Sequence, residues 1–328
     1  MNPANCSASF GWKQSVQPPA LATEGGALVR LGSRVLWVNE TVAYLYEIGS
    51  GRWSEVAEPP TDEGAPTALI QLATGNALLI SQINGVWSSA EYDAESDEWT
   101  VGIPTGQSDE ALLSNFGDGA ILAGGRTRAL DEVHIYREGE WLSPYSLAVG
   151  RFDHGLQVVS KNEVLVVGGR DENGILLASA EILTPEGSVN TGGLVSARAD
   201  FGTHLLADGR ILIAGGEVDT EGATASVEGF DAQSGRFSEL RPVSSPRSGG
   251  STFTLNDGRV LLTGGVGDDP ISDELFVLRT GFWELVSSES RLAPGLEVGL
   301  GNGAVLRLGM RDGVGSSELF CPPRLPRL

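Results

Sequence analysis

The sequence predicts an all-β protein, a seven-bladed β-propeller whose blades are four-stranded antiparallel sheets. Three observations predict this fold. A short apolar run ending in a glycine pair recurs along the chain, each copy carries four strand-like stretches, and the two ends of the chain complement each other. Repeats of about 40–50 residues with four strands each are typical of propellers.

The recurring run is clearest in four copies. They read "AILAGG", "VLVVGG", "ILIAGG" and "VLLTGG", and their first glycines are Gly124, Gly168, Gly215 and Gly264. Weaker copies of the run occur at Asn39, Ser81 and Gly309. Successive anchors are separated by 42 to 49 residues, which gives seven units.

Each unit contains four short stretches separated by turn residues. The first two flank a polar turn such as "ADGR" or "NDGR", which suits a tight hairpin because such turns need positive φ. The second stretch is wholly apolar, which predicts a strand buried on both faces. An aromatic residue in the fourth stretch, expected to fill the gap between blades, is present as Trp53, Trp99, Trp141, Phe237 and Trp283. The fourth unit departs from this pattern, with Val189 near that place.

This pattern resembles the kelch repeat, a four-stranded propeller blade with a glycine pair after its second strand and a later tryptophan. The resemblance covers essentially the whole chain. We therefore expect one propeller domain over residues 1–328, with blades at 21–58, 64–103, 107–146, 150–193, 197–242, 246–288, and 291–322 completed by 6–17. By analogy only, a kelch-type chain implies a binding or scaffold role, since a fold does not dictate function.

The last blade is expected to be closed by the N-terminal strand. The seventh unit ends after three strands, and "SASFGWKQSV" supplies the missing one, with Trp12 at the aromatic position. Cys6 lies six residues before Trp12, and Cys321 ends the third strand of the seventh unit, so both map to one point of the blade. We predict that Cys6 and Cys321 are close. Whether they form a disulfide or are two small apolar residues in contact is left open.

Composition narrows the classes of partner. A formal charge of −21 disfavours binding to nucleic acid or to an anionic membrane surface. No apolar run reaches 18 residues, and the first residues lack the basic and apolar regions of a signal peptide. We expect a cytoplasmic monomer, with a processed secreted form as the open alternative.

Arginine recurs at one position of the repeat. Seventeen residues before the first glycine stand Arg151, Arg198 and Arg247, and Arg291 fits with one residue of slack. The linker that leads into a blade and the loop that follows the glycine pair share one end of the blade. Two further arginines, Arg126 and Arg170, follow glycine pairs on that face.

The four arginines at one repeat position predict a basic arc that binds a carboxylate through its guanidiniums, with Arg126 and Arg170 as further ligand-binding candidates on the same rim. The alternative is structural: each arginine pairs with a carboxylate of a neighbouring blade, with Asp153 and Asp200 as candidates. The two aspartates belong to a shared R-x-D-x-G pattern, Arg151-Asp153-Gly155 and Arg198-Asp200-Gly202.

Two functions follow from this face. The leading hypothesis is a stand-alone binding or scaffold module for a peptide, a protein or a small acidic ligand. The alternative is a small-molecule isomerase, lyase or cyclase in which the arginines hold an anion and His154, Asp153 or Asp200 moves protons. We expect no cofactor and no metal site, because the three histidines fall in three different units without metal-ligand spacing. No recognised catalytic motif is present in the sequence.

Overall fold

A computed structural model describes most of the chain. The described residues are 6, 10–16, 26–61, 66, 68–83, 86–104, 111–126, 130–142, 145–219, 222–267, 271–286, 292, 295–311 and 314–322. They group into two compact units. The first consists of Met1–Gly106, Phe253–Asp257 and Val286–Leu328, and the second of Gln107–Thr252 and Gly258–Leu285. The expectation of one domain over residues 1–328 stays a prediction.

The first unit contains blades 1, 2 and 7. Blade 1 consists of β2 (Ala27–Leu31), β3 (Arg34–Val38), β4 (Ala43–Glu47) and β5 (Arg52–Val56). Blade 2 consists of β6 (Ala68–Gln71), β7 (Ala77–Ile83), β8 (Val86–Asp93) and β9 (Glu98–Pro104). Blade 7 consists of β29 (Leu296–Gly299), β30 (Val305–Arg311), β31 (Val314–Cys321) and the N-terminal β1 (Gly11–Gln14).

The second unit contains blades 3 to 5 and blade 6 without Phe253–Asp257, which belong to the first unit. Blade 3 has β10 (Leu112–Phe116), β11 (Gly119–Ala123) and β12 (Glu132–Arg137), and its last strand is divided into β13 (Glu140–Trp141) and β14 (Tyr145–Ser146). Blade 4 has β15 (Gly155–Ser160), β16 (Glu163–Val167), β17 (Ala180–Thr184) and β18 (Gly187–Asn190). Blade 5 has β19 (Gly202–Leu205), β20 (Ile211–Ala214), β23 (Val227–Asp231) and β24 (Arg236–Leu240), with a hairpin of β21 (Glu217–Val218) and β22 (Gly222–Ala223) between its second and third strands. Blade 6 has β25 (Ser251–Thr254), β26 (Val260–Thr263), β27 (Glu274–Val277) and β28 (Phe282–Leu285).

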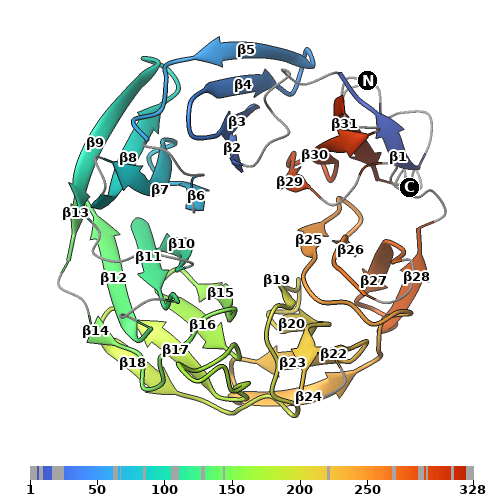
Figure 1. Ribbon diagram of the computed structural model, residues 1–328. Helices are drawn as coiled ribbons and strands as arrows, with labels where there is room; N and C mark the ends of the chain where they lie inside the picture. Colours follow the sequence, from blue (N-terminus) through green and yellow to red (C-terminus); the bar gives the residue numbers. More distant parts are fainter. Residues whose placement is uncertain are drawn as a thin grey trace. The chain divides into compact units, whose positions relative to one another are not determined.

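All blades are antiparallel, and the strands of each blade lie side by side in the order just given (Figure 1). This confirms the predicted all-β, seven-bladed propeller class. In the described part of the chain, no helix is long and apolar enough to span a bilayer.

The second strands form the core of the blades, as their apolar sequences predict. Every residue of β11, β20 and β26 is buried, and β3 and β16 expose only their first residues. First strands of consecutive blades contact each other within each unit: β2 lies against β6 and β29, and β15 lies against β10 and β19. This packing brings the linkers before the first strands together with the loops after the second strands.

The fourth-strand aromatic stacks mainly on an aromatic of the third strand. Tyr92 and Trp99 are register partners with ring centroids 4.9 Å apart. The Trp99 indole also donates a hydrogen bond of 3.0 Å to the carbonyl of Ala57 in blade 1. Equivalent aromatic pairs are Tyr46–Trp53, Tyr136–Trp141, Phe230–Phe237 and Phe276–Trp283. The expectation that these rings fill a gap between blades is thus refined, because each ring first completes its own blade.

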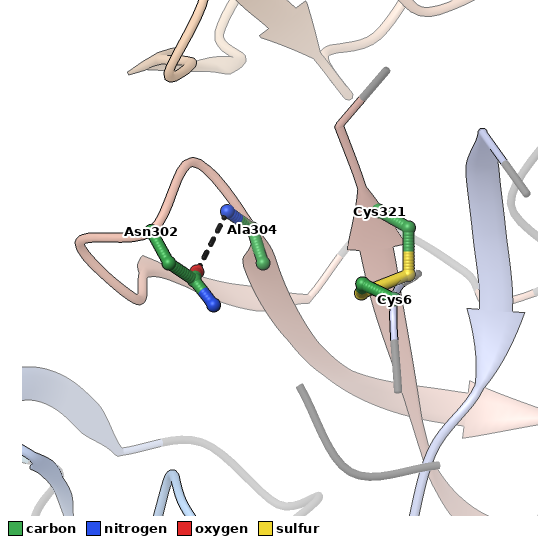
Figure 2. The surroundings of a disulfide bond; sticks show 4 residues. All are labelled: Cys6, Asn302, Ala304 and Cys321. Atoms are coloured by element: carbon green, nitrogen blue, oxygen red, sulfur yellow. Dashed lines mark hydrogen bonds between the residues drawn. A yellow bond between two sulfur atoms is a disulfide. The ribbon is translucent and has the colours of Figure 1, made fainter. Parts of the chain in front are cut away.

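Blade 7 is closed by the N-terminal strand, as predicted. Trp12 on β1 pairs in register with Phe320 on β31, and the two rings meet edge to face at 5.4 Å. Cys6 and Cys321 form a disulfide with a Cα–Cα separation of 5.2 Å (Figure 2). Figure 2 also shows Asn302, whose side-chain oxygen accepts the N–H of Ala304 at 3.0 Å in the turn between β29 and β30.

Candidate functional site

The arginine that precedes the first strand is buried in blades 4, 5 and 6. We call these residues the leading arginines; they are Arg151, Arg198 and Arg247, and each exposes at most 1% of its surface. A buried guanidinium needs a hydrogen-bond acceptor for each of its donors, or the desolvation cost is large.

Blade 5 shows how the acceptors are supplied. The Nη1 atom of Arg198 donates to the carbonyls of Gly215 at 2.8 Å and Ser226 at 3.1 Å, which bracket the loop between β20 and β23. Its Nη2 atom forms an ion pair of 2.7 Å with Glu228 on β23. The side chain therefore ties the glycine turn to the third strand of its own blade.

The same arrangement is present in blades 4 and 6. Arg151 donates to Gly168 at 2.8 Å and pairs with Glu181 at 2.9 Å. Arg247 donates to Gly264 at 3.3 Å and pairs with Glu274 at 2.7 Å. The offset of seventeen residues between arginine and glycine, visible in the sequence, is thus a hydrogen-bonded contact.

The third-strand glutamate also binds the linker. Glu181 accepts the backbone N–H groups of Ala148 at 2.8 Å and Val149 at 3.3 Å. Burial alone would raise the pKa of Glu181, but hydrogen bonds from Ser188 and Ala148 and the charge of Arg151 outweigh it, so the pKa is lowered. The carboxylate stays ionised and holds the linker, the leading arginine and β17 together.

The glycine pair connects one blade to the next. The carbonyl oxygen of Arg198 accepts the N–H of Gly169 in blade 4 at 2.8 Å. A Cβ on Gly168 would lie 2.7 Å from the same oxygen, and its φ of 61° also favours glycine. Gly125 and Gly216 donate in the same way to Arg151 and Arg247.

These contacts correct the expectation of a basic arc open to solvent. The guanidiniums of Arg151, Arg198 and Arg247 are enclosed and paired with carboxylates, but these lie in their own blades and not, as the structural alternative expected, in a neighbouring blade. Their carboxylate partners are the third-strand glutamates, whereas Asp153 and Asp200 had been the expected ones. The fourth predicted arginine, Arg291, lies outside the described residues.

The residue two positions after each leading arginine has a left-handed backbone. Asp153 and Asp200 both have φ of 51°, and the matching residue of blade 6 is Gly249, with φ of 66°. Asp200 donates its N–H to the carbonyl of Asp153 at 3.0 Å, and Gly249 donates to that of Asp200 at 2.7 Å. Backbone hydrogen bonds therefore hold the two aspartates in a row across consecutive blades.

Around these aspartates lies a partly exposed group of charges, which we call the charged strip. It consists of Arg126, Asp153, Arg170, Asp200 and Glu217, on the linkers and on the loops after the second strands of blades 3 to 5. Asp153 faces Arg126 at 3.5 Å and Arg170 at 3.9 Å, and Arg170 also pairs closely with Glu217. The structure thus brings together four of the predicted site residues, Arg126, Arg170, Asp153 and Asp200, with Glu217.

Asp200 is a carboxyl group of the strip whose pKa is shifted. Its pKa is raised, first because the surrounding protein partly removes water from the carboxyl and then because Glu217 and Asp153 repel its charge. Arg170 and a hydrogen bond from Ser248 offset part of this rise. A donor or cation brought next to Asp200 would relieve this repulsion.

His154 follows Asp153 of the strip in sequence and is buried. It exposes 6% of its surface, and neither ring nitrogen has a hydrogen-bond partner among the described residues. A Cβ on Gly124 would lie 2.5 Å from its Cε1 atom, so the ring packs against the glycine turn of blade 3. Burial, with a contribution from Arg151, lowers the pKa of His154 to about 3. The imidazole is therefore neutral and enclosed, which does not fit the expected role of a proton carrier at the surface.

The remaining histidines are packed within blades. Burial lowers the pKa of His204 to about 4, and its ring lies 3.1 Å from the hydroxyl of Thr252. His134 pairs with Glu132 at 2.9 Å. Among the residues that the structure describes, no group of three or more His, Cys, Asp or Glu side chains is placed to hold a metal ion.

Sequence reasoning missed the glutamate partners of the leading arginines. Glu181, Glu228 and Glu274 lie in the stretches "ASAEIL", "SVEGFD" and "DELFVL", 30, 30 and 27 residues after their arginines. This repeated spacing was available as a signal. Burial of the pair was not, because a strand pattern does not say which charged residues are enclosed.

Comparison with known proteins gives a likeness of fold. No protein-family model matches the chain, and no curated protein matches its sequence. Among solved structures, the chain is similar to a fungal alcohol oxidase of the AA5 family in complex with copper, with 16% identity and a TM-score of 0.62. That match covers 78% of this chain and 61% of the oxidase.

A second solved structure, YjhT, has 12% identity and a TM-score of 0.56, and the match covers 83% of this chain and 99% of YjhT. Both likenesses concern the propeller architecture alone, because identities this low carry no site residues across.

Proposed function

We propose that the protein is a kelch-type propeller that acts as a binding module for a protein or peptide, through the charged strip of its second unit. The observation that carries this proposal is the arrangement of the strip: partly exposed charges follow leading arginines that are themselves buried and bonded to the frame through their Nη atoms. Binding residues on loops that are positioned by a rigid scaffold are a common arrangement.

The backbone under the strip supports the proposal. Glycine adopts left-handed φ most readily and aspartate also tolerates it, and Gly249 occupies the equivalent position in blade 6. Aspartate at positions 153 and 200 therefore presents a carboxylate at a fixed place, which glycine cannot do. Among the described residues, the buried arginines leave Arg126 and Arg170 as the exposed basic groups of the strip, beside three carboxyl groups, so a purely anionic ligand is no longer favoured.

A second candidate is a small-molecule isomerase, lyase or cyclase at the same strip. The observation in its favour is the raised pKa of Asp200 beside two other carboxyl groups, an arrangement suited to proton transfer. A small metabolite that raises the melting temperature of the wild-type protein but not of Asp200→Asn would favour this candidate.

The binding proposal is tested with a random peptide library displayed against the purified protein. Peptides selected in this way should lose about tenfold or more in affinity for Glu217→Lys, because the strip loses a surface charge and its pairing with Arg170. The matched control is Glu186→Lys, in the turn between β17 and β18 at the opposite end of blade 4. If the selected peptides bind both variants with the affinity of the wild type, the interaction lies elsewhere and the proposal is refuted.

A further inference from the structure

The proposed binding face can be assigned a class of partner. We infer that the charged strip and two exposed apolar side chains beside it, Ile175 and Val266, bind a basic peptide segment, with a lysine or arginine of that segment on Asp200. The inference rests on the proposed function and specifies the chemistry of its ligand.

The loops that carry the two apolar side chains are hydrogen-bonded to the strip or to a residue next to it. Next to Arg170, the loop of residues 171–175 is held by its guanidinium, which donates to Gly174 at 3.3 Å, and Ile175 follows with 61% of its surface exposed. At the other end, Val266 is 69% exposed and exchanges two backbone hydrogen bonds of 2.8 Å with Ser248.

Ser248 connects Val266 to the strip. The next residue, Gly249, donates its N–H to the carbonyl of Asp200 at 2.7 Å, and Asp200 is bonded through its backbone to Asp153. Ile175 and Val266 therefore flank the charges, on blades 4 and 6 of the same unit. An occupant that spans blades 4 to 6 meets an apolar side chain at each end and charge in between.

Charge selects a cationic occupant. The strip has three carboxyl groups, Asp153, Asp200 and Glu217, against two guanidiniums. Arg170 pairs with Glu217 and Asp153, and its charge offsets only part of the repulsion that these two carboxylates exert on Asp200. An ammonium or guanidinium placed on Asp200 removes this repulsion and gains a charge-assisted hydrogen bond. The net charge of −21 also attracts a basic partner over longer distances.

The apolar side chains select a peptide over a free polyamine. Ile175 and Val266 gain from contact only with a ligand that carries apolar groups next to its cation. A peptide with alternating apolar and basic residues meets both requirements, whereas a linear polyamine meets only the second.

The inference is tested by fluorescence polarisation with two labelled ten-residue peptides, one alternating valine with arginine and one alternating valine with glutamate. We expect the arginine peptide to bind at least about tenfold more tightly than the glutamate peptide at moderate salt. Asp200→Asn keeps a side chain that tolerates left-handed φ and should weaken the arginine peptide about tenfold. Val266→Ser should weaken it about threefold.

The control for general attraction to an acidic protein is Glu186→Gln, which removes one charge at the opposite end of blade 4 and should leave affinity within about twofold. Equal losses in Asp200→Asn and Glu186→Gln would overturn the inference, as would equal binding of the two peptides. Displacement of the arginine peptide by an equimolar amount of spermidine would overturn the assignment to a peptide.

A failure of the basic-peptide inference can be distinguished from a failure of the proposed function. If library selection yields acidic or uncharged peptides that still depend on Glu217, the strip remains a binding face and only the basic class of partner is wrong. If no selected peptide depends on the strip, the proposed function fails first.

Discussion

Blade 5 of the second unit and blade 7 of the first unit both bury an arginine beside a glutamate, yet they use it differently. In blade 5, Arg198 precedes the first strand and bonds to main-chain carbonyls and Glu228. In blade 7, Arg307 lies on the second strand, pairs with Glu297 on the first, and places its guanidinium 4.1 Å from the centroid of the Trp12 ring.

The two blades differ in which chain segments have to be held together. The strands of blade 5 are contiguous in sequence, so the arginine needs only to fix a turn and a linker. Blade 7 is assembled from both ends of the chain, and its N-terminal strand is held by Trp12 and by the Cys6–Cys321 disulfide. A buried ion pair therefore holds the linker and the glycine turn in blades 4 to 6, whereas blade 7, which joins the chain ends, also has a covalent bond and aromatic packing.

The largest expected effect comes from Glu228→Ala. It leaves the Arg198 guanidinium buried without its counter-charge and removes the acceptor of the Val195 and Ser196 N–H groups. The free energy of unfolding, measured by urea denaturation, should fall by about 3–5 kcal/mol. Glu239→Ala, on the exposed face of the same blade, should stay within about 0.5 kcal/mol of the wild type. Similar losses in both variants would contradict a structural role for the pair.

The disulfide of blade 7 should contribute somewhat less. Cys6→Ser opens a link between residues 315 positions apart and should lower the free energy of unfolding by about 2–4 kcal/mol. The wild-type protein treated with a reductant should unfold at the same urea concentration as the variant. A wild-type midpoint that does not change on reduction would show that β1 is held without the bond.

Replacing His154 should change the response to acid. The folded protein keeps this histidine neutral, with a pKa of about 3, whereas the unfolded chain takes up a proton near pH 6.5. The free energy of unfolding therefore falls as pH falls from about 6.5 towards 3. Between pH 7 and pH 5, it should fall by about 2 kcal/mol less in His154→Leu than in the wild type. Unfolding curves at pH 7 and pH 5 measure this difference. An unchanged pH dependence in the variant would mean that His154 is hydrated in the folded state.

The smallest expected effect is a gain in the free energy of unfolding at pH 7. The pKa of Asp200 is raised in the folded protein, so its ionisation costs stability as pH rises above its ordinary value of 3.8. Asp200→Asn should raise the free energy of unfolding at pH 7 by no more than about 0.5 kcal/mol, and so raise the melting temperature slightly. This gain should vanish below pH 3.8. A melting temperature that falls at pH 7 would show that the carboxylate is stabilising.

The repeat made the blades, the strand order and the closure of blade 7 predictable. Its glycine pairs, apolar second strands and Trp12 each report a local backbone or packing requirement. It did not reveal that Arg198 points inward, because a leading arginine on the surface and one bonded to the Gly215 carbonyl share one sequence position. The row of Asp153 and Asp200 was visible as R-x-D-x-G, but the gathering of Glu217 and Arg170 around it depends on contacts between blades.

The central claim is that a leading arginine holds its blade while the residue two positions later meets the partner. It is tested most directly by the affinity of one library-selected peptide for two folded variants, Arg198→Met combined with Glu228→Gln, and Asp200→Asn, compared at 10 °C. We expect the double variant to bind within about twofold of the wild type and Asp200→Asn to bind about tenfold more weakly. The reverse order, with affinity lost in the double variant and kept in Asp200→Asn, would contradict the account.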